Sequence, residues 1–157
     1  MIGRIRLLSL ALLAISAAVL VAAGPASASS PGESGTVAIN SSTAGLVAQV
    51  LIEVPLTYSC GPMDTVTDEE TEVHVQQAVA NGGVAIGEGH FDQNPTICDG
   101  ATRTVMIQVL PVAGLHFHRG LAIVKADLLI GGQLSGSNVF VNATMPWQKI
   151  RLRRSKS

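Results

Sequence analysis

Two histidines separated by one residue, His116 and His118, are the sharpest candidates for metal chemistry in the sequence. In an extended segment alternate side chains share a face, so both imidazoles would point the same way. His74 or His90 could then supply a third nitrogen for Zn²⁺ or Cu²⁺. Two loop histidines with ordinary surface hydrogen bonds explain the same pattern. Metal binding is therefore an alternative function, and the sequence predicts no cofactor.

A second group of possible ligands is acidic. It comprises Asp64, Asp68, Glu69, Glu70 and Glu72. Calcium takes several oxygen ligands, but these carboxylates lack the spacing of an EF-hand loop. We therefore expect this segment to be a charged, solvated loop after a turn at Gly61-Pro62-Met63-Asp64.

Positive charge gathers in the last nine residues of the chain, which contain Lys149, Arg151, Arg153, Arg154 and Lys156. Such a segment suits weak, salt-sensitive attachment to an anionic surface, and a solubilising tail is the other interpretation. The expected partners are anionic cell-envelope polymers or another extracellular protein. Specific nucleic-acid binding is not expected, because the rest of the mature chain is acidic and aromatic residues make up only 3% of the sequence.

Sequence signatures of catalysis are absent. The chain has no Gly-x-Ser-x-Gly, no His-Glu-x-x-His and no phosphate-binding Gly-x-x-x-x-Gly-Lys-Ser/Thr motif. We therefore predict a binding or structural module without catalytic activity, with an enzyme lacking a known motif as the third possibility.

The first 28 residues have the features of a secretory signal peptide. Arg4 and Arg6 precede an apolar run over residues 7–23, and Ala26-Ser27-Ala28 provides the small residues that signal peptidase requires. An uncleaved membrane anchor is the alternative, because the run approaches the length of a spanning helix. Cleavage would leave no integral membrane segment and predicts a secreted protein, free or associated with the envelope.

The two cysteines, Cys60 and Cys98, are expected to form a disulfide, because exported proteins fold in an oxidising compartment. A redox or metal-binding pair would favour Cys-x-x-Cys spacing, which is absent. The disulfide is therefore predicted to be structural.

Alternating apolar residues predict strands after residue 43. A long central strand is expected over 46–60, with a bulge, an edge or a change of sheet near Pro55. A hairpin is predicted around Asn81-Gly82-Gly83. The remaining strands are expected over 101–110, 120–130 and 138–144, with a turn at 131–137. The chain thus divides into a signal peptide (1–28), a flexible leader (29–43) with one short apolar step at 37–39, a β domain (44–146) and a basic tail (147–157).

About seven short strands without helical periodicity predict an antiparallel β-sandwich, with a closed barrel as the alternative. Several short motifs also resemble those of small secreted β-sandwich proteins of actinobacteria that have no assigned activity. The motifs are Tyr58-x-Cys60, Val73-x-Val75-x-Gln77, Gly87-x-Gly89, Cys98-Asp99-Gly100 and Gly120-x-Ala122-x-Val124-x-Ala126. This resemblance implies an immunoglobulin-like sandwich with one disulfide. Trp147 departs from the immunoglobulin pattern, because it lies beside the tail rather than against the bridge.

Overall fold

The computed structural model of the protein describes residues 33–91, 96–112 and 115–155, and it is built from strands. This confirms the predicted all-β class. The strands are β1 (Gly35–Ala38), β2 (Thr43–Val47), β3 (Leu51–Cys60), β4 (Thr65–Ala78), β5 (Val84–His90), β6 (Arg103–Pro111), β7 (Gly120–Leu134) and β8 (Ser137–Arg154). A single 3-10 turn, η1 (Ala80–Gly82), forms the tip between β4 and β5.

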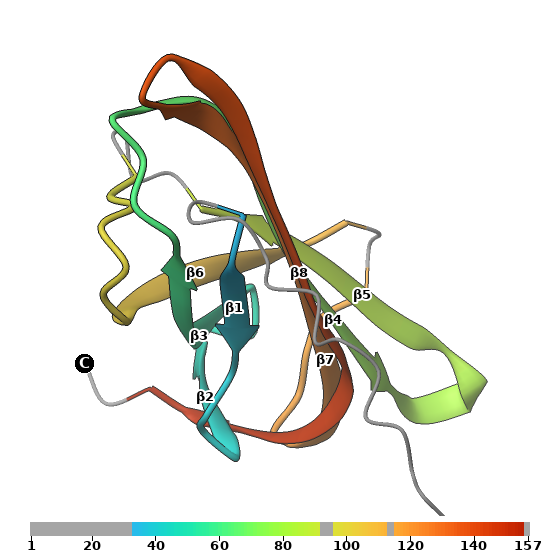
Figure 1. The fold of residues 1–157 in the computed structure, drawn as a ribbon. Helices are drawn as coiled ribbons and strands as arrows, with labels where there is room; N and C mark the ends of the chain where they lie inside the picture. Colours follow the sequence, from blue (N-terminus) through green and yellow to red (C-terminus); the bar gives the residue numbers. More distant parts are fainter. Residues whose placement is uncertain (1–32, 92–95, 113–114, 156–157) are drawn as a thin grey trace, which may run out of the picture.

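The strands form one sheet that closes on itself. Hydrogen bonding follows the order β1-β3-β2-β8-β7-β4-β5-β6, and β6 also pairs with β3, so seven strands complete a ring while β1 extends the β2 side of β3 (Figure 1). An immunoglobulin-like sandwich consists of two separate sheets packed face to face. The continuous pairing corrects that prediction in favour of the closed barrel that the sequence left as the alternative.

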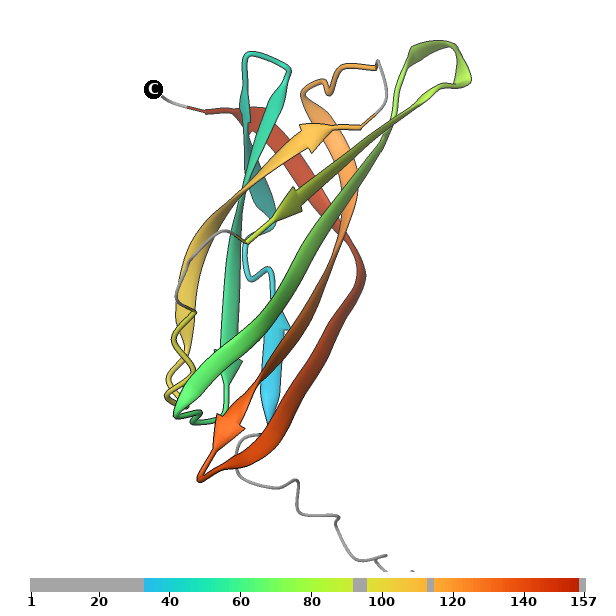
Figure 2. The same ribbon diagram turned by 90° about the horizontal axis from the view of Figure 1, so that it is seen from above.

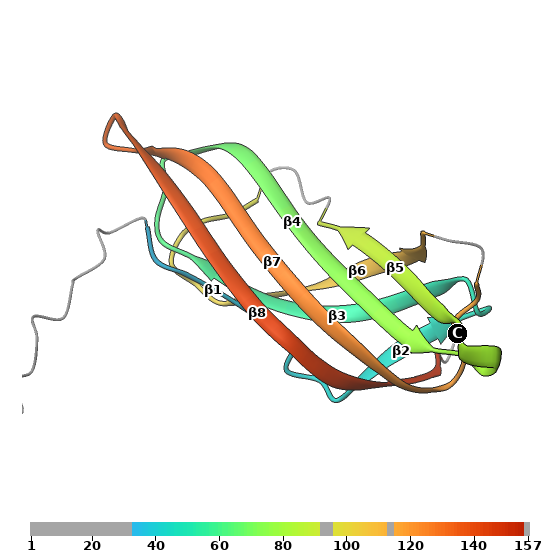
Figure 3. The same cartoon turned by 90° about the vertical axis from the view of Figure 1, so that its right-hand side faces the viewer.

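The longest strands, β7 and β8, form a hairpin that curves along the wall beside β4 (Figure 3). The turn predicted over 131–137 is shorter, because only Ser135 and Gly136 turn the chain, with φ of 51° and 78°. Gly132 instead lies within β7, where a Cβ would collide with the carbonyl oxygen of Thr65. The glycine pair therefore serves close packing of β7 on β4 rather than a turn.

The stretch predicted as one strand over 46–60 is a hairpin. Ala48 and Gln49 adopt φ of 47° and 64°, and the chain reverses between β2 and β3. Positive φ in hairpin turns favours Gly, Asn or Asp, so Ala48-Gln49-Val50 gave no turn signal. Pro55 lies where β3 changes neighbours from β2 to β1 within the same sheet, while its pairing with β6 continues without a register shift.

The acidic segment predicted as a loop is part of β4, which begins at Thr65. Asp68, Glu69 and Glu70 pair with residues of β7, across a register shift next to Val66. The expectation failed because consecutive charged residues carry no alternation, whereas the neighbouring strand supplies the hydrogen bonds. The hairpin predicted around Asn81 and Gly82 is confirmed as the β4–β5 connection.

The interior of the barrel is filled by alternate residues of each strand. The largest fully buried side chains are Tyr58, Phe117, Ile52, Leu56, Ile107, Leu128, Ile130, Ile150 and Leu152. Burial raises the pKa of the Tyr58 hydroxyl, and the ring of Tyr58 meets that of Phe91 edge-on at 5.2 Å. The predicted disulfide between Cys60 and Cys98 is present, with the Cα atoms 5.0 Å apart. It ties the end of β3 to the segment that precedes β6.

The segment predicted as a basic tail over 147–157 continues β8 as far as Arg154. Ile150 and Leu152 are buried, whereas Lys149, Arg151 and Arg153 face outward between and beyond them. The alternation of apolar and basic residues therefore completes the barrel wall, and the boundary drawn at residue 146 does not separate the tail from the sheet. Lys156 lies outside the described residues.

The predicted leader also contributes to the sheet. Residues 35–38 form β1 against the end of β3, which matches the short apolar step expected there, and β2 begins at Thr43. The predicted signal peptide lies outside the described residues. Among residues 33–91, 96–112 and 115–155, we find no helix with the length and apolar character needed to cross a bilayer.

The two ends of the barrel differ. The turn at residues 48–50, the β4–β5 tip, the start of β7 and the end of β8 gather at one end, and the β7–β8 hairpin lies at the other (Figure 2). We call the first the arginine end, because Arg119, Arg151, Arg153 and Arg154 lie there. We call the second the acidic end, because Asp64, Asp68, Glu69 and Glu70 lie on or beside the strands that reach it.

Candidate anion-binding site

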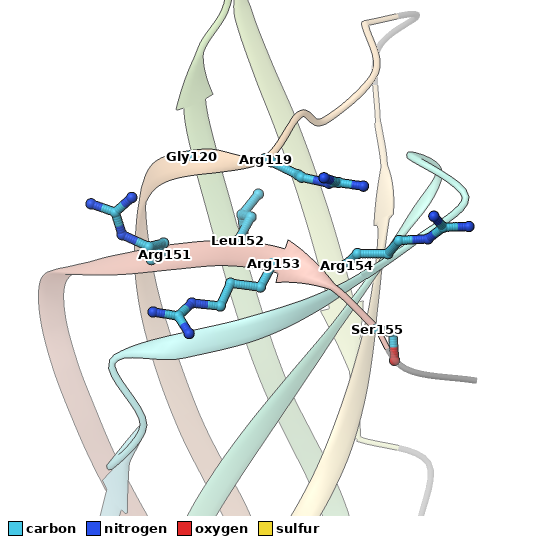
Figure 4. A pocket seen from close by; sticks show the side chains of 7 residues that line it. All are labelled: Arg119, Gly120, Arg151, Leu152, Arg153, Arg154 and Ser155. Atoms are coloured by element: carbon cyan, nitrogen blue, oxygen red, sulfur yellow. The ribbon is translucent and has the colours of Figure 1, made fainter.

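A wide, open hollow lies at the arginine end of the barrel. This outer pocket has a volume of about 940 Å³, and its lining includes Arg119, Arg151, Leu152, Arg153 and Arg154 (Figure 4). All but Arg119 are consecutive residues of β8. The pocket therefore belongs to the strand that the sequence analysis identified as basic.

Strand alternation divides these arginines into two pairs. In Figure 4 the side chains of Arg151 and Arg153 extend toward the left of the view, whereas those of Arg119 and Arg154 both extend toward the right. Arg154 follows Ile150 and Leu152 in the inward-facing series, but it is exposed because the barrel ends there. Arg154 thus occupies a position of the inward-facing series, but its charged side chain lies at the mouth of the barrel.

Arg119 reaches the site through the hairpin register. Gly120 pairs with Leu152, so the residue before it arrives beside Arg153 and Arg154. His118, which precedes Arg119, is held by the buried Gln77 of β4. The side-chain NH2 of Gln77 donates to the carbonyl oxygen of His118 at 2.8 Å, and its side-chain oxygen accepts from the backbone N–H of His118 at 2.7 Å. Phe117 is fully buried in the core. Arg119 is therefore positioned by two anchors rather than by a loop without tertiary contacts.

Gln77→Leu should lower the free energy of unfolding by about 2–4 kcal/mol, because it leaves both backbone groups of His118 without their partner. Urea denaturation measures the loss, and amide hydrogen exchange should show faster exchange at His118. Gln76→Leu is the matched control, because Gln76 lies on the outer, half-exposed face of the same strand. Equal losses in the two variants would contradict the role of Gln77.

A second, smaller hollow adjoins the first. This mouth pocket has a volume of about 340 Å³, and its lining combines Leu46, Ala48 and Gln49 with Arg119 and Arg154. Ala48 and Gln49 of this lining both have positive φ. A residue with a side chain adopts positive φ at a cost in free energy, which the surrounding structure must offset. Strained turns of this kind cluster at binding sites, so their position beside two arginines supports a functional site.

The charges at this end are uncompensated within the described chain. Among the described residues, Arg103 pairs with Asp99 and Lys125 pairs with Asp127, and the ring nitrogens of His74 lie 3.0 and 3.8 Å from carboxylate oxygens of Glu72 and Glu88. None of these pairs includes an arginine of the two pockets. Glu53 lies across Gly45 of β2 from Arg153, and its carboxylate accepts a hydrogen bond from the Ser155 hydroxyl at 2.8 Å. Guanidinium groups remain protonated at any ordinary pH, so both pockets favour anions.

The two histidines singled out by the sequence lie next to this site, since His118 directly precedes Arg119. His116 and His118 are exposed on either side of the buried Phe117. Within the described residues, no group of three or more His, Cys, Asp or Glu side chains is placed to hold a metal ion. His74 instead lies on the barrel wall, with Nε2 at hydrogen-bond distance, 3.0 Å, from a carboxylate oxygen of Glu72.

A hollow of about 310 Å³ on the side of the barrel is acidic, and its lining includes Glu70, Glu72 and Asp127. Partial burial alone would raise the pKa of Asp127. Hydrogen bonds from Lys125 and Thr144 outweigh it and hold this pKa below its usual range. The carboxylate is thus already partnered by a lysine 3.0 Å away, which makes it a structural ion pair.

Sequence reasoning identified Lys149, Arg151, Arg153 and Arg154 as an anion-binding group but missed Arg119, Ala48 and Gln49. Pairing residues outward from the Ser135-Gly136 turn places residue 119 beside residue 152, and the register shift between Val124 and Ala126 moves it beside residue 153. Lys149 lies farther along β8, opposite Ile123, and does not line the pockets.

Fold and site together define a small, disulfide-linked β-barrel domain with a cationic mouth. No protein family, curated protein or solved structure matches the chain. The site itself must therefore carry any functional argument.

Proposed function

We propose that this protein is a non-catalytic binding module that acts outside the cytoplasm and binds anionic groups of the cell envelope through its arginine end. The observation that carries the proposal is the convergence of Arg119 and Arg154 on one mouth pocket, with Arg151 and Arg153 beside it. Arginine forks match phosphate and carboxylate geometry, so such a site suits polymers or headgroups that carry these groups.

The proposed location outside the cytoplasm is supported by the disulfide, because cytosolic thiols are kept reduced. It is also supported by the features of residues 1–28 in the sequence.

The proposed lack of catalysis is supported by the chemistry of the pocket linings. Guanidinium groups do not serve as nucleophiles or general bases, because they do not lose their proton. Among the described residues that line the two pockets, Ser155 is the one hydroxyl, and its partner is the carboxylate of Glu53 rather than a histidine. The arrangement is suited to holding an anion in place.

The test is binding of fluorescently labelled inorganic polyphosphate by fluorescence anisotropy at 50 and 200 mM salt. Charge-assisted hydrogen bonds contribute about 1.5–3 kcal/mol each, so Arg119→Gln with Arg154→Gln should raise Kd at least about tenfold. Binding by the parent protein should weaken as salt rises, because exposed charges are screened.

Arg103→Gln is the control for loss of positive charge away from the site. Arg103 lies at the start of β6, paired with Asp99 near the acidic end. Its affinity for polyphosphate should stay within about twofold of the parent's. A parent protein that binds no polyphosphate at 50 mM salt, or one that binds it equally well after loss of both mouth arginines, would refute the proposed function.

A further inference from the structure

We propose that the arginine end docks on an anionic phospholipid bilayer, with exposed apolar side chains around the arginines entering the interfacial layer of the membrane. This inference rests on the proposed function and names its target. It is carried by the pairing of unpartnered cations and exposed apolar side chains on one end of the barrel.

The apolar side chains come from three separate parts of the chain. Leu121 of β7 is 56% exposed, Val84 of β5 is 45% exposed, and Val50 in the β2–β3 turn is 44% exposed. All three lie at or next to the turns and strand ends that gather at the arginine end (Figure 2). Exposed apolar residues grouped with cations mark an interaction surface rather than a scatter of single side chains.

Cations and apolar residues alternate across the β7–β8 ribbon. On its outer face Leu121 pairs with Arg151 and Ile123 pairs with Lys149. One step farther from the end, the Lys125 ammonium lies 5.9 Å from the centre of the Trp147 ring. Membrane-surface segments combine side chains of these kinds, because aliphatic groups and tryptophan enter the acyl boundary while cations contact the headgroups.

A soluble polyanion would use the arginines and leave the apolar side chains in water. A bilayer accounts for both sets, because it offers phosphates and an apolar layer within one surface. The mouth pocket can accept a headgroup phosphate between Arg119 and Arg154, since both guanidinium groups extend to the same side (Figure 4).

The charge distribution would also orient the barrel. β7 contains 15 residues, so at roughly 3.3 Å per residue the acidic end lies tens of ångströms from the arginines. The Debye length in physiological salt is about 8 Å, so repulsion of Asp64, Asp68, Glu69 and Glu70 by anionic lipid is screened when the arginine end faces the membrane. The barrel is therefore expected to stand on its arginine end.

The experiment is sedimentation with large vesicles of phosphatidylcholine, with and without 30% phosphatidylglycerol. The protein is produced by export of the full-length chain, and its starting residue is checked by intact mass, so every variant carries the same N-terminus. Binding should require phosphatidylglycerol. Arg119→Gln and Arg154→Gln should each lower the partition coefficient about fivefold, since each cation near such a surface contributes about 1 kcal/mol.

Leu121→Thr with Val84→Thr tests apolar entry, and threonine preserves the strand preference of both positions. This double variant should lose roughly three- to tenfold in vesicle binding and keep the parent's affinity for polyphosphate. Phe140→Thr is the matched control, because Phe140 is 62% exposed on β8 near the acidic end, opposite Gly131. Its vesicle binding should equal that of the parent.

The outcomes separate the two proposals. Polyphosphate binding without vesicle binding, or vesicle binding unchanged by the threonine pair, overturns bilayer docking and leaves the proposed function standing. Loss of both kinds of binding in the parent overturns both. If light scattering at low salt shows that the molecular mass doubles with concentration, the acidic end of a second copy occupies the site and bilayer docking is wrong.

Discussion

Phe117→Ala should lower the free energy of unfolding by about 3–5 kcal/mol, among the largest effects expected of a single substitution in this chain. The ring is fully buried and closes the core just before the arginine end. It also packs on Gly87 of β5, where even a Cβ would lie 2.8 Å from the ring. Because side chains in a packed core relax only partly around a deleted ring, the substitution leaves a cavity.

The same substitution should weaken polyphosphate binding several-fold, because Phe117 and the His118–Gln77 hydrogen bonds together hold Arg119. Urea denaturation measures the stability, and anisotropy well below the unfolding midpoint measures the affinity. Phe140→Ala is the control, because the exposed Phe140 ring should change stability by less than about 0.5 kcal/mol. A loss below about 1.5 kcal/mol in Phe117→Ala would show that the ring is not a core residue.

Much of the wall of the barrel was predictable from the sequence, because the side-chain period of a strand is local. Val73 and Val75 share one face of β4 by their spacing, as Val124 and Ala126 do in β7, and all four are buried. The β4–β5 hairpin was predictable too, since Asn81 and Gly82 both adopt the positive φ that such a tip requires.

The closure of the sheet was not predictable in this way. It depends on pairing between β3 and β6, such as Val54 with Ile107, whose residues are far apart in the sequence and carry the same alternation in a sandwich or a barrel. The reversal at Ala48 and Gln49 was hidden for a different reason. Both residues favour negative φ, so tertiary pairing of β2 with β8 overrides their local preference.

The candidate site also has a part that was predictable from local sequence and a part that depends on pairing between distant residues. The cations of β8 were visible as a cluster, because they are neighbours in the sequence. The basic segment could have been predicted as a barrel strand only if Ile150 and Leu152, which face inward, had been recognised as core residues. Arg119 joins them only through the long β7–β8 register, which depends on where the turn falls. A turn misplaced by two residues would move Arg119 away from the mouth.

Removal of the disulfide by Cys60→Ala with Cys98→Ala should lower the free energy of unfolding by about 4 kcal/mol, because the bridge closes a loop with a sequence separation of 38 residues and restricts the unfolded chain. The urea midpoint should fall by roughly 2–3 M for a domain of this size. Parent protein unfolded under reducing conditions should match the variant.

The bridge lies at the far end of β3 from the β2–β3 turn. Polyphosphate affinity should therefore be unchanged wherever the variant is folded, and a parallel loss of affinity would show that the arginine end depends on the bridge. An unchanged urea midpoint would contradict a stabilising role for the bridge.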